Sequence, residues 1–115
     1  MTAEAEKEAL TAFKNAVNMT TRQITAWLET AESKEVGSKE TDEAESVGHR
    51  SGKQIVRILG KKPAEHTAAD FTHMAKVAAC VKRHLAQRPE GDVTATRWRY
   101  SLMNWGHDPQ KKRGV

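Results

Sequence analysis

The amino-acid sequence predicts an all-α domain, a compact bundle of about five helices. Apolar residues recur at spacings of three and four, which is the period of one buried helix face. Several segments open with a Ser, Thr or Asp that can cap a helix N-terminus, and Gly or Pro closes them. No stretch alternates apolar and polar residues as a half-buried strand would. The length of 115 residues is usual for one domain, so residues 1–115 are expected to form a single helical unit.

The first predicted helix covers residues 3–17, and the second begins after Thr20. Thr20 and Gln23 have the spacing of a capping box, in which each side chain accepts a hydrogen bond from the other residue's backbone N–H. Met19 and Ile24 flank this box as a hydrophobic staple would. The expected buried residues of the two helices are Leu10, Phe13, Val17, Ile24, Trp27 and Leu28.

The segment 31–49 shows no apolar periodicity. It contains two Lys and six Asp or Glu, together with Ser, Gly and Thr. A segment of this composition buries too little apolar surface to offset the entropy lost on ordering. We therefore predict a long, mobile acidic loop after the second helix.

The third predicted helix follows this loop. The run Ser51-Gly52-Lys53-Gln54 has the pattern of a second capping box, and Gly60 and Pro63 would end the helix. Its expected core residues are Ile55, Ile58 and Leu59.

Two further helices complete the predicted bundle. Thr67 and Asp70 mark the start of the fourth helix, and Asp92 or Thr94 would cap the fifth. The apolar stripe of the fourth helix suits a partner helix, within the domain or in a second subunit. Residues 108–115 are predicted to form a basic, disordered tail. The expected buried residues are Phe71, Met74, Ala78, Val81 and Leu85 in the fourth helix and Trp98, Leu102 and Trp105 in the fifth.

The charge of the chain is distributed unevenly. Residues 50–115 carry fourteen Lys or Arg against five Asp or Glu, although the net charge of the whole chain is only +4. A basic half attracts phosphate-rich or acidic partners, and it also serves simply as a solubilising surface. The two glycines of the turn 48–52 would let a phosphate approach free amides at a helix N-terminus, although an ordinary capped loop has the same composition. The candidate nucleic-acid-binding residues are Arg50, Ser51, Gly52, Lys53, Arg57, Lys61, Lys62, Arg97 and Arg99.

Catalytic and metal-binding patterns are weak in this sequence. His66, Asp70 and His73 are metal-ligand types, but they would lie at the edge of a capped helix and form no H-E-x-x-H pattern. Cys80 and His84 are four residues apart and could touch, but the apolar neighbours of Cys80 predict a buried thiol without a catalytic role. We expect a non-enzymatic protein with no catalytic residues, no metal and no cofactor.

The sequence also bears on the cellular compartment. One cysteine excludes an intramolecular disulfide. No apolar run approaches the ~20 residues of a membrane span, and the acidic N-terminus is not a signal peptide. We expect a cytoplasmic protein that makes no membrane contact and is nucleoid-associated if it binds DNA.

Several stretches of the chain carry a family resemblance. They are residues 15–20, Trp27-Leu28-Glu29-Thr30, Glu45-Ser46-Val47-Gly48-His49-Arg50-Ser51-Gly52, His84-Leu85-Ala86-Gln87-Arg88-Pro89 and residues 96–109. On these residues the chain resembles a family of short, uncharacterised bacterial and fungal proteins that are often labelled as DNA-binding proteins. The resemblance covers nearly all of residues 13–109. It implies nucleic acid as the partner and identifies no contact residue.

The function expected from the sequence is non-enzymatic binding of nucleic acid, DNA rather than RNA. The contacts would go mainly to the phosphates of duplex DNA, with little sequence selectivity. The third helix could act as a recognition helix beside the second or the fourth. The alternative is a helical protein-interaction module or homodimer that uses the stripe of the fourth helix and the acidic loop.

Overall fold

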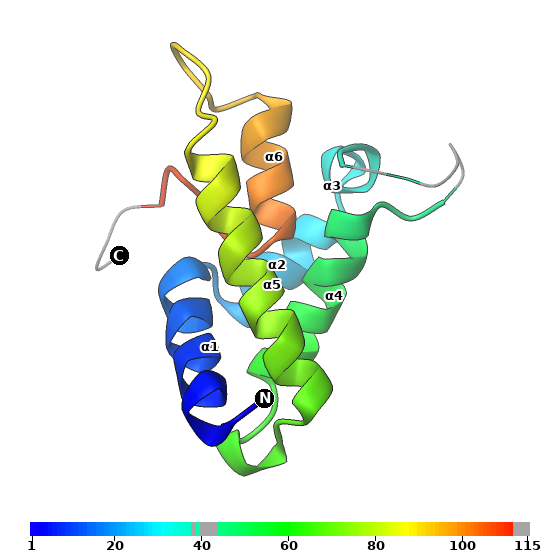
Figure 1. Cartoon of the computed structure of the whole chain (residues 1–115). Helices are drawn as coiled ribbons and strands as arrows, with labels where there is room; N and C mark the ends of the chain where they lie inside the picture. The colour runs from blue at the N-terminus through cyan, green and yellow to red at the C-terminus, as the bar shows by residue number, and fades with distance from the viewer. Residues whose placement is uncertain (38, 40–43, 112–115) are drawn as a thin grey trace.

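The computed structural model describes residues 1–37, 39 and 44–111, and every regular element within them is helical (Figure 1). The all-α prediction is therefore confirmed. The elements are α1 (Ala3–Ala16), α2 (Thr21–Leu28), α3 (Ala31–Glu35), α4 (Val47–Leu59), the 3₁₀ turn η1 (Pro63–Glu65), α5 (Ala68–Leu85) and α6 (Arg97–Asn104).

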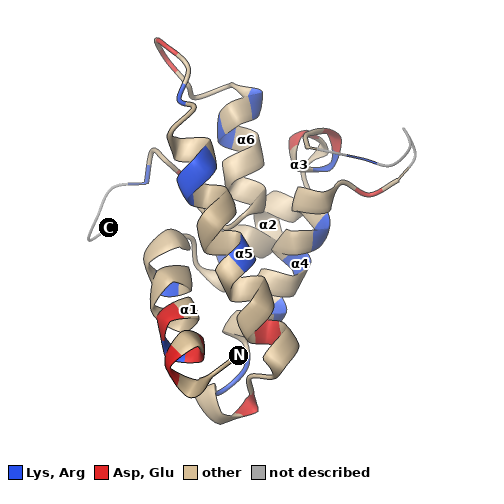
Figure 2. Ribbon diagram, in the orientation of Figure 1, with Lys and Arg blue, Asp and Glu red and all other residues tan. Residues whose placement is uncertain are grey.

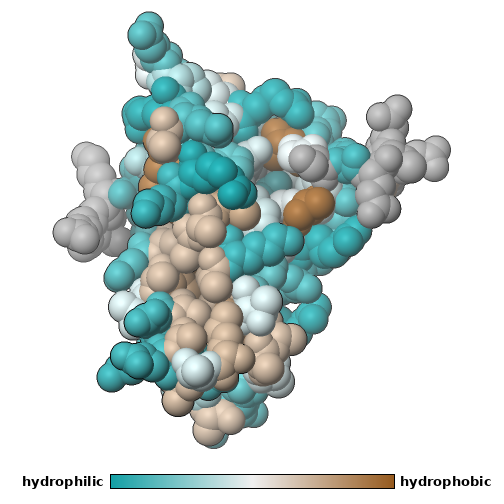
Figure 3. Space-filling view, viewed as in Figure 1, coloured by the Kyte–Doolittle hydropathy of each residue, from teal (hydrophilic) through white to brown (hydrophobic). Residues whose placement is uncertain are grey.

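The longest helix, α5, forms the centre of the bundle. α1 packs along one side of α5, and α4 lies on the other side (Figure 1). α2 packs against α4, and α6 contacts α2, α3, α4 and α5. Pale-brown surface runs along the lower half of the face in Figure 3, whereas hydrophilic residues dominate the upper half. No helix in the described part of the chain is long and apolar enough to cross a membrane.

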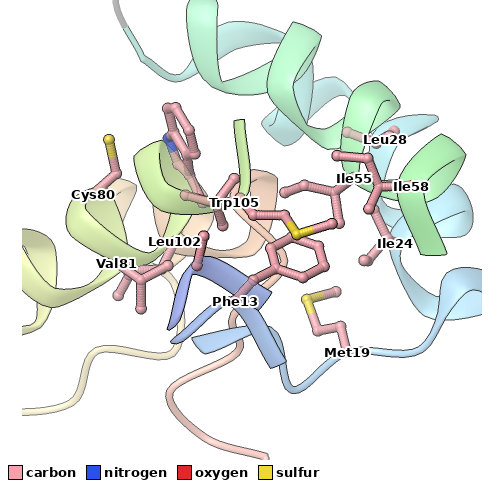
Figure 4. Close-up of a cluster of buried hydrophobic side chains, with 13 residues drawn as sticks. Phe13, Met19, Ile24, Leu28, Ile55, Ile58, Cys80, Val81, Leu102 and Trp105 are labelled. Atoms are coloured by element: carbon pink, nitrogen blue, oxygen red, sulfur yellow. The ribbon is translucent and has the colours of Figure 1, made fainter. Parts of the chain in front are cut away.

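The core lies between these helices and is shown in Figure 4. The prediction that Leu59 and Leu85 belong to the core is wrong, because Leu59 is 37% exposed and Leu85 is 40% exposed. Each is the last residue of its helix, where the facing helix no longer covers it. Val77 is fully buried instead, since Met74, Val77 and Val81 also follow a spacing of three and four. The buried apolar residues are Ala9, Phe13, Met19, Ile24, Leu28, Val36, Ile55, Ile58, Met74, Val77, Cys80, Val81, Val93, Leu102 and Trp105.

Two of the predicted helix starts are confirmed. The Thr20 hydroxyl accepts from the Gln23 N–H at 3.1 Å, and the Gln23 side chain accepts from the Thr20 N–H at 3.0 Å. The same reciprocal pair joins Thr67 and Asp70 at the start of α5. Both helices therefore begin where local side-chain bonding alone can satisfy their first free amides.

The predicted start of the last helix is wrong. Thr96 caps α6 by accepting from the Arg99 N–H at 3.2 Å. Asp92 bonds instead to the backbone N–H and the hydroxyl of Thr94, two residues later. The side chain of Asp92 therefore fixes the turn before the helix rather than the helix itself.

Much of the predicted loop 31–49 belongs to the folded domain. Thr30 caps the short helix α3, and both Ser33 and Val36 are buried. α4 begins at Val47, inside the predicted loop. The prediction of mobility is therefore wrong for these parts, because buried side chains hold them to the core. For residues 38 and 40–43 the prediction lies outside the described residues.

The first part of the predicted tail is attached to the domain. The Asn18 side chain donates to the Asp108 carbonyl at 2.9 Å and accepts from the Asp108 N–H at 2.8 Å. The Lys111 ammonium donates to the Asn18 carbonyl and, at 3.0 Å, to the Gln23 side chain. The prediction of a disordered tail is wrong for residues 108–111, and residues 112–115 lie outside the described part of the chain.

Candidate functional site

The N-terminus of α4 is built differently from the sequence prediction. The cap is Ser46, whose hydroxyl accepts from the His49 N–H at 3.0 Å and whose carbonyl accepts from the Arg50 N–H. The predicted cap at Ser51 is wrong, and residues 48–52 are helix rather than an anion-binding turn. Two glycines so close together favour a loop by local propensity, but tertiary packing places both in the helix.

Ser51 and Gly52 face the protein interior. Ser51 is 2% exposed, and its hydroxyl hydrogen-bonds the Nε2 of His73 at 2.9 Å. Partial burial, assisted by the charge of Lys76, lowers the pKa of His73 and so favours its neutral imidazole. A Cβ on Gly52 would lie 2.7 Å from Leu28 and 2.8 Å from the Asn104 carbonyl oxygen. Both residues are wrong as phosphate contacts, because no phosphate can reach them.

The outer face of α4 is exposed and cationic. Arg50, Lys53 and Arg57 lie on it, and all three side chains reach solvent. The carboxylate of Glu45 contacts the Lys53 ammonium at 2.6 Å, the Arg50 Nε at 3.8 Å and the ring of His49. The hydrogen bond from Lys53 is the main cause that lowers the pKa of Glu45, so this carboxylate is charged and offsets part of the local positive charge.

A groove of about 540 Å³ separates α4 from α5. Arg57 and Gln54 line it from α4, and Thr72, His73 and Lys76 line it from α5. Sequence reasoning missed Lys76 and Gln54. The sequence did contain a signal that points to Lys76, because residues 71–89 contain four Lys or Arg and no Asp or Glu. Asp70 also lines the groove from α5, so the groove combines two cations and one carboxylate with neutral hydrogen-bonding groups.

Lys61 is half-buried and paired with a carboxylate. Its ammonium contacts the Asp70 carboxylate at 2.7 Å, and this bond is the main cause that lowers the pKa of Asp70. Lys62 and Arg97 are exposed, but Lys62 belongs to the link between α4 and α5 and Arg97 is the first residue of α6. In Figure 1 that link lies at the bottom of the molecule and the start of α6 at the top. The structure therefore does not bring the predicted contacts into one site, and the cations of α4 with Lys76 form the coherent group. We call Arg50, Lys53, Arg57 and Lys76 the α4–α5 face.

Arg99 is also engaged within the domain. Its Nε and Nη2 donate to the two carboxylate oxygens of Asp108 at 3.1 and 3.0 Å, and its Nη1 donates to the Thr94 carbonyl. Arg99 therefore holds the segment after α6 to the domain. Its predicted role as a phosphate contact has no support from this geometry. Partial burial raises the pKa of Asp108, but the hydrogen bonds from Arg99 and from the Gln110 N–H outweigh burial and lower it below 3.8.

Replacing Asp108 by asparagine should lower the free energy of unfolding by about 1–2 kcal/mol at neutral pH, through loss of charge-assisted bonds. A carboxyl with a lowered folded pKa stabilises the fold above its unfolded pKa and ceases to do so as the pH falls through the folded value. The difference between parent and Asp108→Asn should therefore shrink as the pH falls below 3.8. Urea unfolding at neutral and acid pH measures it, and a pH-independent difference would contradict the role of this ion pair.

Side chains from the stretches that carry the family resemblance form a buried polar network around α4 and α6. Asn104 is fully buried, and its Oδ1 accepts from the Trp27 indole at 2.7 Å and from the Ser33 hydroxyl. Its Nδ2 donates to the Ser33 carbonyl at 2.9 Å. The His49 ring bridges Glu45 and the Leu28 carbonyl. These residues join α2, α3, α4 and α6 to one another.

The remaining candidate groups serve structural contacts. The ring of His66 is 3.4 Å from the Ile58 carbonyl, while Asp70 and His73 have the partners given above. No group of three or more metal-ligand side chains occurs within the described ranges. Cys80 is buried as predicted, and His84 donates to its carbonyl rather than to its thiol. Arg83 Nη2 donates to the Cys80 sulfur at 3.3 Å, so a cation lies beside the thiol.

These features define an all-helical domain; Figure 2 shows Lys and Arg on α4, α5 and α6, whereas acidic residues gather on α1. The family model described as a protein of unknown function (DUF3140) matches residues 12–103, so the chain belongs to that family. No curated protein and no solved structure matches the chain.

Proposed function

We propose that the domain binds duplex nucleic acid through the α4–α5 face, with DNA preferred to RNA. The contacts go to phosphates and have little sequence selectivity. The observation that carries the proposal is the charge of the two neighbouring helices. α4 contains three Lys or Arg and no Asp or Glu, and α5 contains three Lys or Arg and one acidic residue, Asp70, which is paired with Lys61. Neutralised phosphates release counterions, which makes such a surface a favourable partner for a duplex.

The shape of α4 supports the same proposal. Arg50, Lys53 and Arg57 are spaced by three and four residues, so they follow one line about 10 Å long on the helix surface. This length is close to the width of the major groove, about 12 Å. Gln54 and Thr72 add neutral donors in the groove beside that line. On binding, phosphates would replace the Glu45 carboxylate as the partner of Lys53 and Arg50, and the carboxylate would become solvated.

The alternative is a protein-interaction module or homodimer that uses the apolar stripe of α5. In this structure Met74, Val77 and Val81 of that stripe are buried, and α1 covers the helix. The stripe is therefore used within the chain, which favours the nucleic-acid proposal. Light scattering of the purified chain across protein concentration would reveal a dimer.

The double variant Lys53→Gln with Arg57→Gln tests the proposal. The slope of log affinity against log salt should fall by roughly two, because each lost phosphate contact reduces it by about 0.9. The loss should be alike for unrelated duplex sequences. Fluorescence anisotropy with labelled DNA and RNA duplexes over a salt series measures both quantities.

The matched control is Lys7→Gln with Lys14→Gln, which makes the same charge change at exposed positions of α1. This control should retain the parental slope. An unchanged slope in the α4 variant, or an equal change in the α1 control, would refute the α4–α5 face as the interface. Absence of binding by the parent at low salt would refute nucleic-acid binding altogether.

A further inference from the structure

The side chain of His49 links two helices from a buried position. His49 belongs to the first turn of α4 and is only 6% exposed. Its Nε2 lies 2.9 Å from the carbonyl oxygen of Leu28, the last residue of α2, and its Nδ1 contacts the carboxylate of Glu45. The ring therefore connects the end of α2 with the residue before the cap of α4.

Both partners of this ring are hydrogen-bond acceptors. A backbone carbonyl has no proton to donate, so Nε2 must carry a proton to bond with Leu28. The hydrogen bond from Lys53 is the main cause that lowers the pKa of Glu45, which favours its charged carboxylate and leaves Nδ1 as the donor. A neutral imidazole has only one N–H group. The two bonds therefore exist together only when both ring nitrogens are protonated.

The end of α2 favours the charged form of the ring. The last carbonyls of a helix lack partners within it and carry a partial negative charge. The Leu28 carbonyl is one of these, and the Nε2 of His49 bonds with it. The partial positive charge at the N-terminus of α4 acts in the opposite direction. The carboxylate of Glu45, in direct contact with Nδ1, offsets that effect.

Other charged groups surround the ring, and they come from α2, α3 and α4. His49 lines a hollow of about 360 Å³ between these elements, and some of the charged groups line it too, while others contact Glu45. Among their residue types and that of the ring, only histidine ordinarily changes its charge between about pH 5 and 8. A charge change at this junction in that range is therefore assigned to His49. The surrounding groups are Glu29, Lys34, Arg50 and Lys53.

We propose that His49 is a proton-dependent latch between α2 and α4. With both nitrogens protonated, the ring bonds to the Leu28 carbonyl and to the Glu45 carboxylate at once. When the ring gives up one proton to solvent, the other stays on Nδ1, because a bond to a charged carboxylate is stronger than one to a carbonyl. The lone pair of Nε2 then faces the Leu28 oxygen, and the bond between α2 and α4 is lost. The latch is closed at low pH and opens as the pH rises.

The latch adjoins the α4–α5 face through Glu45. This carboxylate also pairs with Lys53 and Arg50, so loss of the ring's positive charge leaves more of its negative charge for these two cations. A duplex bound to that face should therefore bind more weakly once the latch has opened. The latch itself does not depend on duplex binding, and either proposal can fail without the other.

NMR spectroscopy of the free domain tests the latch. The ring ¹⁵N resonances of His49 report its protonation, and the carbonyl ¹³C resonance of Leu28 reports the bond at the end of α2. From about pH 5 to about pH 9, which brackets the ordinary range of histidine, both should change in one step with a common midpoint. A Leu28 resonance that stays constant while the ring titrates overturns the proposal. A ring that keeps one protonation state throughout also overturns it.

Three variants assign the step to the ring. His49→Gln keeps an N–H donor for the Leu28 carbonyl but cannot titrate, so the Leu28 step should disappear. Glu45→Gln removes the charge beside Nδ1 and should move the midpoint to lower pH by at least about one pH unit. Glu29→Gln is the matched control, because it makes the same change in the same hollow at a residue without a hydrogen bond to the ring. A step that persists in His49→Gln, or equal shifts in the two glutamate variants, overturns the proposal.

Discussion

Replacement of Asn104 by alanine is expected to lower the free energy of unfolding by about 3–5 kcal/mol. Asn104 is fully buried and joins α6 to α2 and α3 through its amide. The change leaves the Trp27 indole, the Ser33 hydroxyl and the Ser33 carbonyl without their partner. Each unsatisfied buried group costs about 1–3 kcal/mol, and relaxation makes the sum less than additive. A loss of this size is a large fraction of the 5–15 kcal/mol that is usual for a domain.

Urea unfolding followed by circular dichroism measures this loss. Ser33→Ala is the graded comparison, since it removes one donor and leaves the Asn104 oxygen bonded to Trp27. Its cost should be about 1 kcal/mol. A cost for Asn104→Ala no larger than that of Ser33→Ala would show that the three bonds do not act as a structural junction.

The parts of the fold that could be predicted from sequence are those with local causes. Thr20 with Gln23 and Thr67 with Asp70 cap their helices through bonds that span only three residues. The apolar stripes of the helices could also be predicted from sequence, because one periodic apolar face is enough to indicate a helix. The short helix α3 lacks such a stripe. Ser33 and Val36 of this region are buried only because α6 lies beside it, which no local pattern reveals.

The candidate site was predicted in part for a similar reason. Arg50, Lys53 and Arg57 do lie on an exposed face, since helical spacing fixes which residues share a side. Lys61 and Arg99 are paired with carboxylates of other elements, and a charge count does not show such pairings. Lys76 joins the cations of α4 only through the packing of α5 beside α4.

The assignment of Ser51 and Gly52 to a turn was wrong because local propensity and tertiary packing disagree there. Glycine is unfavourable in a helix interior by about 1 kcal/mol relative to alanine, so two glycines near a serine indicate a loop. At Gly52 the absence of a side chain is what lets α4 approach Leu28 and the backbone of Asn104. The gain from that close packing outweighs the local preference.

Gly52→Ala should therefore destabilise the domain by about 1–3 kcal/mol, the range typical of overpacked cores. The added methyl would lie 2.7 Å from a Leu28 methyl and 2.8 Å from the Asn104 carbonyl oxygen, and the latter belongs to the backbone. Leu28 can adjust its rotamer, but the carbonyl cannot move without shifting α6. In a loop, or on an exposed helix face, the same change would be neutral or stabilising.

Gly60→Ala is the matched control for this change. Gly60 has a φ of −79° at the end of α4, which alanine adopts readily, and a Cβ there would meet only backbone oxygens at 3.6 Å. The control should change the free energy of unfolding by less than about 0.5 kcal/mol. If urea unfolding shows Gly52→Ala to be as stable as Gly60→Ala, α4 does not pack closely on α2 and α6. The position of Ser51 and Gly52 would then have to be reassigned to an accessible turn.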